Sequence, residues 1–409
     1  MRIIADLHIH SPYARAVSKN MTLENLDYWA GIKGITVMAT GDFTHPLWIK
    51  EIQKKLEPAE SGLYVLGKRL RSSIQKEPTR FMLGVEISSI YSQGGKVRRV
   101  HNLVMFPSIE SAEKFNTVLG TRGNLRSDGR PIVGVSSKEL LKMAFDVDPQ
   151  CVFVPAHIWT PWFSLFGSKS GFDTLEECFE EHSKLIFALE TGLSSDPAMN
   201  WRVSKLDKYS LISNSDSHSL RRIGREVNIV KSDLSYKGIW SAIKSKNPKR
   251  FLETIEYFPE EGMYHFDGHR VCKVRMEPKE TKRKKGLCPK CKRPVTIGVV
   301  NQVEKLADRP ADFLPPKHVP FKNMVPLDEI IAESLGVGVA SKKVQTEYLS
   351  LIEKMGSEFF VLYEASLSQL AGATTPEVAE GIKRVREKRL FIDPGYDGEY
   401  GKVKIFERG

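Results

Sequence analysis

Short apolar runs alternate with amphipathic stretches along the first part of the chain, up to about residue 258. The amphipathic stretches have the periodicity of helices that bury one face, and they lie at residues 23–32, 47–56, 109–119 and 138–145. The apolar runs end in polar residues and are typical of buried strands. They lie at residues 2–9, 35–40, 81–87, 100–106, 151–156, 185–190 and 211–213. Strands that alternate with helices predict a parallel sheet, and this many units favours a closed or nearly closed α/β barrel.

The pattern changes from about residue 266. Three cysteines then cluster with a dense run of Lys and Arg between residues 279 and 293, and a proline-rich connector follows. After residue 326 the periodicity again predicts helices, at residues 327–335, 342–355, 364–370 and 376–387. We therefore divide the chain into a barrel over residues 1–258, a cysteine-containing module over 259–305 and a mainly helical C-terminal domain over 306–409.

Composition narrows the class of protein. The chain has 409 residues, of which 41% are hydrophobic and 27% are charged, so it is long enough for two or three domains. No apolar run approaches the roughly 20 residues that span a membrane, and the chain enters a strand directly, without a visible signal peptide. The five cysteines are an odd number and two form a Cys-x-x-Cys, which argues for a reducing compartment rather than a disulfide framework.

A formal net charge of +11 predicts a polyanionic partner. Nucleic acid is the first candidate and an anionic membrane is a distant second. The alternative is a basic surface without a specialised role.

The ends of the predicted strands carry imidazoles and carboxylates. His8 and His10 close the first strand above Asp6, and side chains two apart on a strand share a face. Because barrel chemistry sits at the carboxyl ends of strands, we expect later strand-end residues to converge with them. A single such histidine is as often a core residue as a ligand, but the repetition favours metal. The later candidates are Asp42, Glu86, His101, His157, Glu190, Asp216 and His218.

Mixed imidazole and carboxylate ligands suit transition metals such as Zn²⁺, Mn²⁺ or Fe²⁺ better than Mg²⁺ alone. Metals about 3.5–4 Å apart activate water and hold both the attacking and the leaving oxygen of a phosphate. The sequence therefore predicts two or three divalent ions (Zn²⁺, Mn²⁺ or Mg²⁺) in a hydrolytic site.

This arrangement resembles the polymerase and histidinol phosphatase (PHP) family over roughly residues 1–230. The matching pieces are the opening Asp-Leu-His-Ile-His, a Thr-Gly-Asp, a Gly-Val-Glu, two isolated histidines and a closing Asp-Ser-His. The resemblance implies a distorted (β/α)7 barrel with phosphoesterase activity. It implies catalytic roles for Asp216, Glu86 and His218.

The resemblance also implies a ligand set. His8, His10, Glu86 and Asp216 would hold one metal, and Glu86 would bridge to a second metal held by His101 and His157. His218 would belong to a third metal. Family members have further histidines where this chain has Ser11-Pro12-Tyr13-Ala14-Arg15 and Phe43, so Asp42 or His45 would have to substitute at the third site.

The cysteine-containing module predicts a second kind of metal site. Cys288 and Cys291 form a Cys-Pro-Lys-Cys typical of a zinc ribbon, and Cys272 is the third ligand. We expect His269 to be the fourth ligand, with His265 as the alternative. Four protein ligands leave no open position, so this zinc would be structural and would hold together a segment too polar to form its own core. The alternative is that the cysteines are free structural thiols.

The order of motifs along nearly the whole chain resembles the endonuclease Q family. The motifs after the barrel are Gly-His-Arg-x-Cys, Cys-Pro-x-Cys, Ala-Asp-Arg-Pro and Leu-Asp-Glu-Ile-Ile-Ala-Glu-Ser-Leu-Gly. The resemblance implies a DNA repair endonuclease that cuts on the 5′ side of deaminated bases (uracil, hypoxanthine, xanthine) and of abasic sites, using a metal-activated hydroxide. The implied partner is damaged DNA. An interaction with the replication sliding clamp fits the family, although no clear clamp-binding box ends the chain.

Several basic and aromatic residues are candidates for contacts with DNA. The basic run of the module would present a phosphate-binding surface, unless it is only a solvated loop, and a glycine-containing loop carries further arginines. The loop after His157 holds aromatic residues that either stack on a flipped base or pack as a lid. The candidates are Arg122, Arg126, Lys282, Arg283, Lys284, Lys285 and Trp159.

Two other functions compete with this interpretation: a PHP phosphatase of a small phosphate ester, and a catalytically dead module that binds nucleic acid. We expect a monomeric, cytoplasmic and nucleoid-associated protein with no membrane partner.

Overall fold

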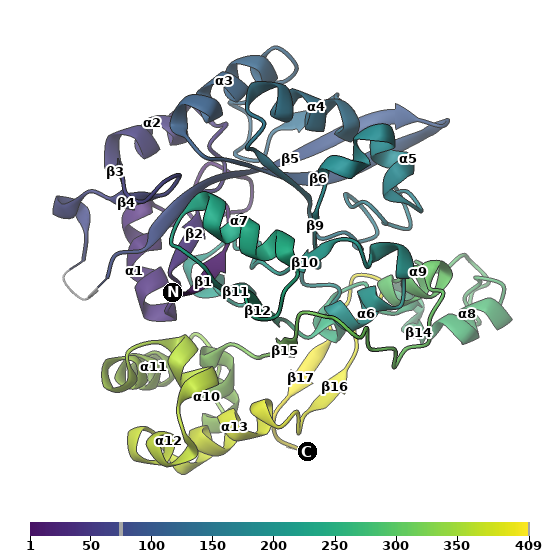
Figure 1. Cartoon of the computed structure of the whole chain (residues 1–409). Helices are drawn as coiled ribbons and strands as arrows, with labels where there is room; N and C mark the ends of the chain where they lie inside the picture. Colours follow the sequence, from purple (N-terminus) through teal and green to yellow (C-terminus); the bar gives the residue numbers. More distant parts are fainter. Residues whose placement is uncertain (73–76, 408–409) are drawn as a thin grey trace.

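Short strands form the wall of a distorted barrel in the computed structural model, which describes residues 1–72 and 77–407 (Figure 1). Around the wall, β1 pairs with β2, β2 with β5, β5 with β6 and β6 with β8, while β9 pairs with β10. Single backbone hydrogen bonds close the two gaps, from Ile158 N to Glu190 O (3.1 Å) and from His10 N to Ser217 O (3.0 Å). The predicted seven-stranded PHP-type barrel is confirmed. Its strands are β1 (Arg2–Asp6), β2 (Val37–Ala39), β5 (Arg80–Gln93), β6 (Lys96–Phe106), β8 (Val152–Pro155), β9 (Ala188–Glu190) and β10 (Ser210–Ile212).

The expectation of an all-parallel sheet is wrong at β6, which runs antiparallel to both β5 and β8. Gly94 and Gly95 both have positive φ (61° and 71°), a conformation that glycine adopts without steric cost, and they turn β5 directly back into β6. His101 therefore lies in the middle of β6 and not at a carboxyl end. The register pairs His101 with Ser88, which puts its side chain on the face of the sheet that carries Glu86.

Additional strands extend this sheet beyond the barrel wall. β11 pairs antiparallel with β1 and with β12, and β15 pairs parallel with β12. A hairpin of β3 and β4 flanks β5, and β7 adds to the other part of β5. The bounds of these strands are β3 (Leu56–Pro58), β4 (Tyr64–Leu66), β7 (Ile132–Val133), β11 (Val227–Lys231), β12 (Phe251–Glu256) and β15 (Phe321–Asn323).

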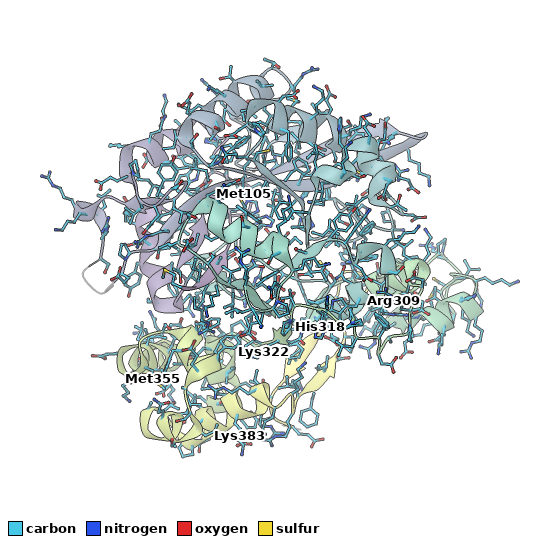
Figure 2. All side chains as sticks on the ribbon, in the orientation of Figure 1. Met105, Arg309, His318, Lys322, Met355 and Lys383 are labelled. Atoms are coloured by element: carbon cyan, nitrogen blue, oxygen red, sulfur yellow. The ribbon has the colours of Figure 1, made fainter. Side chains whose placement is uncertain are left out.

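Helices cover the outside of the barrel close to where the hydrophobic periodicity predicts them. Local sequence sets their ends: Thr22 caps α1 by accepting a hydrogen bond from Asn25 N, and Gly34 ends it with φ 88°. Inside the barrel the core is apolar, with Met105 near its centre (Figure 2). The helices are α1 (Leu23–Lys33), α2 (Pro46–Lys55), α3 (Ile109–Gly120), α4 (Ser137–Val147), α5 (Leu175–Phe179), α6 (Pro197–Trp201) and α7 (Tyr236–Ser245). None of the helices in the described part of the chain combines the length and apolar character needed to cross a membrane.

The cysteine-containing module and the C-terminal domain both pack on the barrel (Figure 1). The module consists of the hairpin β13 (Asp267–His269) and β14 (Val274–Met276), followed by α8 (Pro278–Arg283) and α9 (Val299–Leu306). Val299 and Val303 of α9 belong to the barrel core. Lys322 marks β15 between the barrel and the C-terminal helices (Figure 2).

The C-terminal domain is mostly helical, as predicted. Its elements are α10 (Leu327–Leu335), α11 (Lys342–Met355), α12 (Leu367–Ala373), α13 (Pro376–Arg386) and the hairpin β16 (Phe391–Asp393) and β17 (Lys402–Lys404). The helix expected at residues 364–370 begins later, because Ser366 and Gln369 form a capping box that starts α12. Barrel residues Ile4, Val227 and Ile229 share one apolar cluster with this domain.

A buried ion pair joins the barrel to the C-terminal domain. Lys33 Nζ lies 2.7 Å from Glu358 Oε2, and the two side chains are only 5% and 8% exposed. Glu358 also accepts a hydrogen bond from the backbone N–H of Leu327 at the start of α10 and one from the hydroxyl of Tyr348. One carboxylate therefore ties α1, α10 and α11 together.

We expect the substitution Glu358→Ala to lower the free energy of unfolding by about 3–5 kcal/mol, because it leaves the Lys33 ammonium buried without a partner. The matched control is Glu110→Ala, which removes an exposed pair with Lys114 and should leave the free energy of unfolding close to that of the wild type. Denaturant unfolding followed by circular dichroism measures both. Equal effects of the two substitutions would contradict the role of the pair.

Candidate metal centres

Four side chains converge at one end of the barrel. One ligand atom from each of His8, His10, Glu86 and Asp216 lies within 4.8 Å of the others. His8 and His10 follow β1, Glu86 is on β5, and Asp216 follows β10, so three distant parts of the chain build the group. Its geometry fits a divalent cation.

A second group shares Glu86 with the first. His101 Nδ1 and His157 Nε2 lie 2.6 and 2.9 Å from Glu86 Oε1. The other oxygen, Oε2, lies 3.3 Å from His10 Nε2 and 3.7 Å from His8 Nε2. The two oxygens of one carboxylate thus face two sets of imidazoles, which is the arrangement of a bridging ligand.

Buried carboxylates orient the first pair of imidazoles from behind. His8 Nδ1 lies 3.0 Å from Glu190 Oε1, and His10 Nδ1 lies 3.1 Å from Asp42 Oδ1. Each contact turns the opposite ring nitrogen, Nε2, toward Glu86 and Asp216. A carboxylate behind a ligand histidine fixes the ring and raises its basicity.

The role expected for Asp42 changes accordingly. Its oxygens contact His10 Nδ1 and the backbone N–H of Ser11 (2.6 Å), so the structure places it behind a ligand and not in either metal group. His45 accepts a hydrogen bond from Leu47 N at the start of α2 and stacks on Tyr13. His218 stands next to His10, with ring centroids 4.6 Å apart, but joins no group of three ligands among the described residues.

The state of His8 shows that the ligand atoms of the first group fit a cation. His8 Nε2 is buried and finds no hydrogen-bond partner among the residues that the structure describes, although a buried ring nitrogen is costly to leave unsatisfied. Burial alone would lower the pKa of His8 and His10, but Glu190 and Asp216 around His8, and Asp42 around His10, outweigh it and raise both pKa values. The site therefore concentrates negative charge that a proton or a metal must balance.

The carboxylates of the site stay ionised. Burial would raise the pKa of Glu86, but the polar contact with His101 and the charge of Arg130 outweigh it and hold the pKa well below its usual range. Burial likewise opposes ionisation of Asp216, and the charge of His8 with the hydrogen bond from His10 lowers its pKa. Burial lowers the pKa of His101 to about 4, which keeps this imidazole neutral and able to bind a metal.

Arg130 is a further site residue, and it comes from the glycine-containing loop that also carries Arg122 and Arg126. Its Nη1 lies 3.0 Å from Glu86 Oε2, and its side chain is 27% exposed. The charge of Glu86 raises the pKa of Arg130, which stays protonated. The guanidinium therefore brings positive charge to the open side of the metal groups.

Some of the non-glycine residues with positive φ lie in the same region. Asp42, His157, Phe163 and Asp216 have φ values of 47°, 30°, 62° and 45°, in the left-handed region that favours glycine. Each such residue costs about 1–3 kcal/mol and persists only where its surroundings hold it. Three of these four belong to the metal groups or orient them.

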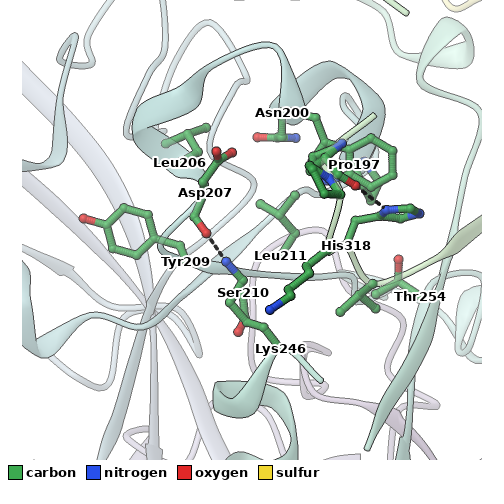
Figure 3. Close-up of a pocket in the computed structure, with 15 residues that line it drawn as sticks. Pro197, Asn200, Leu206, Asp207, Tyr209, Ser210, Leu211, Lys246, Thr254 and His318 are labelled. Atoms are coloured by element: carbon green, nitrogen blue, oxygen red, sulfur yellow. Dashed lines mark hydrogen bonds between the residues drawn. The ribbon is translucent and has the colours of Figure 1, made fainter. Parts of the chain in front are cut away.

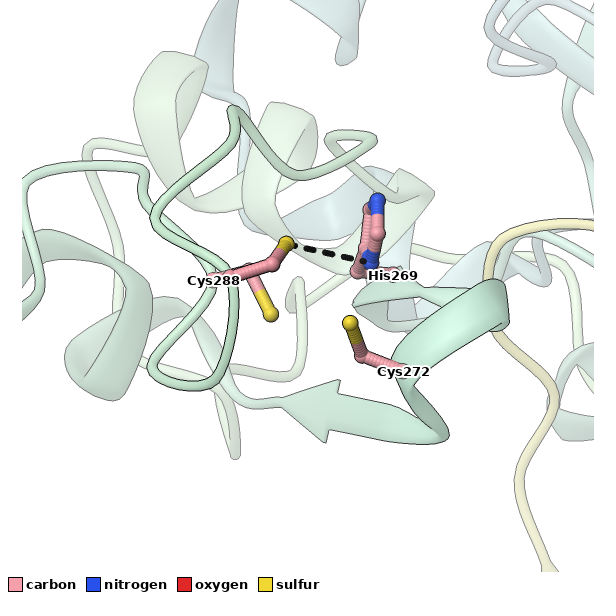
Figure 4. Close-up of side chains that lie close together, drawn as sticks. His269, Cys272 and Cys288 are labelled. Atoms are coloured by element: carbon pink, nitrogen blue, oxygen red, sulfur yellow. Dashed lines mark hydrogen bonds between the residues drawn. The ribbon is translucent and has the colours of Figure 1, made fainter.

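The cysteine-containing module brings its predicted ligands together. One ligand atom from each of His269, Cys272, Cys288 and Cys291 lies within 4.8 Å of the others (Figure 4). His269 ends β13, and Cys272 lies in the turn to β14. The alternative ligand, His265, is outside this group, and burial lowers its pKa to about 4.

The candidates for DNA contacts fall into two classes. The basic residues are exposed, either at the end of α8 and just after it or in the loop after α3: Lys282, Arg283, Lys284, Lys285, Arg122 and Arg126. Trp159 is only 1% exposed, donates to Asn200 Oδ1 (2.8 Å) and packs on Phe166. The expectation that Trp159 contacts DNA is therefore not supported, because its indole fills the interior of the loop.

A cavity of about 320 Å³ lies apart from the metal groups (Figure 3). Ser210, Lys246, Thr254 and His318 are among its lining residues. Ser210 begins β10, whereas Asp216 follows the end of that strand. The cavity thus opens at the amino end of β10 and does not contain the candidate ligands.

Two solved structures share this architecture over the whole length of the chain. The crystal structure of the lesion-specific endonuclease PfuEndoQ from Pyrococcus furiosus matches with a TM-score of 0.87 and 30% identity, over 100% of this chain and 96% of that one. A structure of endonuclease Q in complex with a 27-mer duplex substrate with an abasic lesion at the active site matches with a TM-score of 0.86 and 31% identity, over 100% and 97%. This chain belongs to the endonuclease Q family.

The chain also has relatives at the level of sequence. Residues 326–389 match the model of the MJ0043 C-terminal domain. The uncharacterized protein YqxK of Bacillus subtilis is 30% identical over 98% of this chain and 99% of its own length. The uncharacterized protein MJ0043 of Methanocaldococcus jannaschii is 32% identical over 60% of this chain, and the match spans only 31% of that longer protein.

We expect Cys272→Ser to remove one zinc ion per chain, because it deletes one of four ligands in the module. The matched control is Cys151→Ala, which alters a buried thiol outside the ligand cluster and should leave the zinc content unchanged. Elemental analysis of the purified proteins measures the difference. Unchanged zinc in Cys272→Ser would exclude the structural site.

We expect Glu190→Gln to weaken binding of Mn²⁺ by the barrel by about 10–100-fold, because it removes the carboxylate that orients His8. The matched control is Glu180→Gln, in an exposed pair with Lys138, which should not change the affinity. Titration calorimetry of the metal-free protein gives both values. Equal affinities would show that Glu190 does not act on the metal groups.

Proposed function

We propose that this chain is a metal-dependent endonuclease that hydrolyses the phosphodiester bond on the 5′ side of deaminated bases (uracil, hypoxanthine, xanthine) and of abasic sites in DNA. The observation that carries the proposal is Glu86, whose two oxygens face two separate ligand groups at the open end of the barrel. Membership of the endonuclease Q family and the lesion-containing DNA in one family structure support DNA as the substrate.

Two divalent cations held by these groups would supply water activation and would neutralise charge on the scissile phosphate. His8, His10 and Asp216 would hold one cation, His101 and His157 the other, and Glu86 both. We assign Arg130 to the phosphate, because its side chain is partly exposed beside Glu86 and stays protonated. Hydrolysis on the 5′ side leaves a 3′-hydroxyl and a 5′-phosphate.

His218 is the proposed proton-transfer group. Its side chain is 35% exposed, more than that of Asp216 (24%) or His157 (12%), so it lies toward the opening of the site. Its Nδ1 lies 2.9 Å from the backbone oxygen of Asp216, which fixes the ring and leaves Nε2 toward the substrate side. Burial lowers the pKa of His218, so the imidazole is neutral at pH 7 and able to accept a proton.

Binding of the rest of the duplex falls to the basic surfaces. The exposed Lys282, Arg283, Lys284 and Lys285 of the module and the exposed Arg122 and Arg126 of the barrel would contact phosphates. Such contacts release counterions, so affinity for DNA should fall steeply with salt. An interaction with the sliding clamp and a monomeric state stay predictions from the sequence.

The test uses a labelled duplex with a single deoxyuridine or deoxyinosine, incubated with the protein and Mg²⁺, Mn²⁺ or Zn²⁺. We expect a nick on the 5′ side of the lesion and none in the undamaged duplex. Hydrolysis of a small phosphate ester without any nick would favour the phosphatase alternative. Binding without cleavage under every metal would favour the dead module.

We expect Asp216→Ala to abolish nicking and to retain most of the affinity for the duplex, because it removes a cation ligand and no basic contact. The matched control is Asp146→Ala on α4, an exposed residue paired with Lys142, which should nick at the wild-type rate. Gel assays give the nicking rates and fluorescence anisotropy gives the affinities. An Asp216→Ala protein that still nicks would overturn the ligand assignment.

A further inference from the structure

Two buried glutamates that the proposed mechanism does not use face each other across β11 and β12. Val227 pairs with Ile255 in this antiparallel register, so Glu226 and Glu256 come opposite each other one step further along. The Cβ atoms of such partners are about 4.5–5.5 Å apart, and both glutamates are 0% exposed. Two ionised carboxylates in that arrangement would repel each other strongly, because the interior screens their charges poorly.

Glu226 is poorly placed to carry a negative charge. Its Oε1 accepts a hydrogen bond from the backbone N–H of Tyr257 (2.9 Å), but its buried Oε2 finds no hydrogen-bond partner in the described part of the chain. The positive group beside it, Arg225, donates through Nε to Ser215 O (2.9 Å) instead. A bare anionic oxygen in such a place is costly, whereas a neutral carboxyl group costs much less.

The hydrogen bonds around Glu256 leave room for a proton. Its Oε2 lies 2.9 Å from the Thr191 hydroxyl and 3.1 Å from the Ser213 hydroxyl. Each hydroxyl also lies within hydrogen-bond distance of a backbone oxygen, Ile212 O at 3.1 Å and Ile255 O at 2.9 Å. A hydroxyl carries one proton and cannot donate fully to two acceptors, although its oxygen can accept. A proton on Oε2 resolves this shortage, because a hydroxyl can then donate to the backbone and accept from the carboxyl group.

Burial and the neighbouring charges act in the same direction. Burial raises the pKa of both carboxyl groups, to about 8 for Glu256, and the charge of Glu256 adds to the rise at Glu226. The other charged groups that face the pair are the carboxyl groups of Glu190 and Asp196, which oppose its ionisation, and the guanidinium of Arg225, which favours it. Geometry and charge therefore agree on a pair that is neutral at pH 7.

The pair holds two segments that lie behind the first metal group. One of the two hydroxyls belongs to Thr191, the residue after Glu190, whose carboxylate orients His8. The other belongs to Ser213, which lies three residues before Asp216 in the loop after β10. One carboxyl group thus fixes both the segment that orients a candidate ligand and the segment that carries another.

Two buried amides extend the connection. Asn228, on the same face of β11 as Glu226, donates to Ser213 O (2.8 Å) and to Asn214 Oδ1 (2.9 Å). Asn214 Nδ2 in turn donates to Glu190 Oε1 (2.8 Å). A displacement of β11 against β12 is therefore passed on to the carboxylate behind the first metal group.

We propose that Glu226 and Glu256 form a neutral carboxyl pair that positions both segments of the first metal group and sets an alkaline limit to metal binding. The two are positioning residues, because they act through Thr191, Ser213 and the buried amides. When the pair ionises, its charges repel each other and the proton that joins Glu256 to the hydroxyls is lost. The inference rests on the proposed function only where nicking is the measurement.

The first test measures the affinity of the full chain for Mn²⁺ at pH 7.0 and pH 8.5, without oxygen and after removal of the barrel metals. Electron paramagnetic resonance gives the concentration of the free ion. Glu256→Gln keeps a neutral group of the same shape at both pH values. We expect its affinity to match the wild type within about twofold at pH 7.0 and to exceed it by about threefold or more at pH 8.5. The same ratio at both pH values would overturn the pair.

The matched control is Glu253→Gln on the same strand, whose carboxylate pairs with Lys322 at the surface (2.8 Å). Its affinity for Mn²⁺ should follow that of the wild type at both pH values. A rise at pH 8.5 equal to that of Glu256→Gln would make the effect one of net charge and would also overturn the pair.

A second test needs neither metal nor DNA. The unfolded chain ionises both carboxyl groups above about pH 4.3, whereas the native protein keeps them protonated, so their raised pKa values cost stability increasingly as the pH rises from 5.5 to 8.5. Glu226→Gln and Glu256→Gln remove this loss. We expect the urea midpoint of each variant, relative to the wild type, to rise by at least about 0.3 M between these two pH values. A relative midpoint that does not change with pH would show that the native carboxyl groups are ionised, against the proposal.

Nicking of a duplex with one deoxyuridine, measured with Mg²⁺ from pH 6 to pH 9.5, tests the consequence for the reaction. We expect Glu256→Gln to extend the alkaline limb of the profile by about half a pH unit or more, and Glu253→Gln to leave the profile unchanged. An unchanged profile for Glu256→Gln would refute the alkaline limit. If the wild-type protein does not nick, the proposed function fails, and the Mn²⁺ and urea measurements still decide the pair.

Discussion

The metal site depends on the contacts that the carboxylate of Glu86 makes with the imidazoles and the guanidinium around it. This carboxylate is buried, and it lies within 4 Å of four imidazoles and one guanidinium. A carboxylate in such a place is stable as an anion only because those positive or polarised groups surround it. The imidazoles in turn need its charge, because burial by itself works against their protonated forms. The carboxylates and the imidazoles of the site thus favour one another, and together they form a group that attracts cations.

Holding this arrangement requires more than the ligands. Asp6 accepts hydrogen bonds from the backbone N–H groups of Ser215 and Gly224, so one buried carboxylate fixes both ends of the loop that carries Asp216 and His218. Burial raises the pKa of Asp6 to about 6 in spite of these hydrogen bonds. The same loop contains Arg222, which pairs with Glu329 at the start of α10. The C-terminal domain thus contacts the segment that carries a candidate ligand.

The barrel and the set of residues at its open end could be predicted from the sequence, because apolar periodicity locates strands and a polar residue at a strand end is visible without any structure. That periodicity does not encode the direction of a strand. The sequence therefore predicts a parallel β6, whereas the structure has it antiparallel. The Gly94-Gly95 pair was the available signal of a hairpin. The role of Asp42 could not be predicted, because it depends on which ring nitrogen of His10 the carboxylate contacts. The contact of Arg130 with Glu86 could not be predicted either, because no local sequence pattern determines the path of the loop that carries it. The sequence alone does not distinguish the aromatic residues of the loop after His157 from one another. The structure does, because Trp159 is buried and Phe163 is partly exposed.

The loop after His157 also contacts the cysteine-containing module, so its position depends on the rigidity of that module. Ser168 Oγ donates to Ile297 O of the module (3.3 Å), and Trp162 packs on Tyr264 of the module, while Phe163 contacts a candidate ligand. One short loop therefore touches both the second metal group and the module. Apart from Val299 and Val303, which belong to the barrel core, the buried apolar residues of the module form only a small cluster around Cys288. So small a core would hold such a loop only weakly. A zinc ion bound by His269 and the three cysteines would supply the missing cohesion, so that the basic surface, the loop and the metals keep fixed distances along a bound duplex.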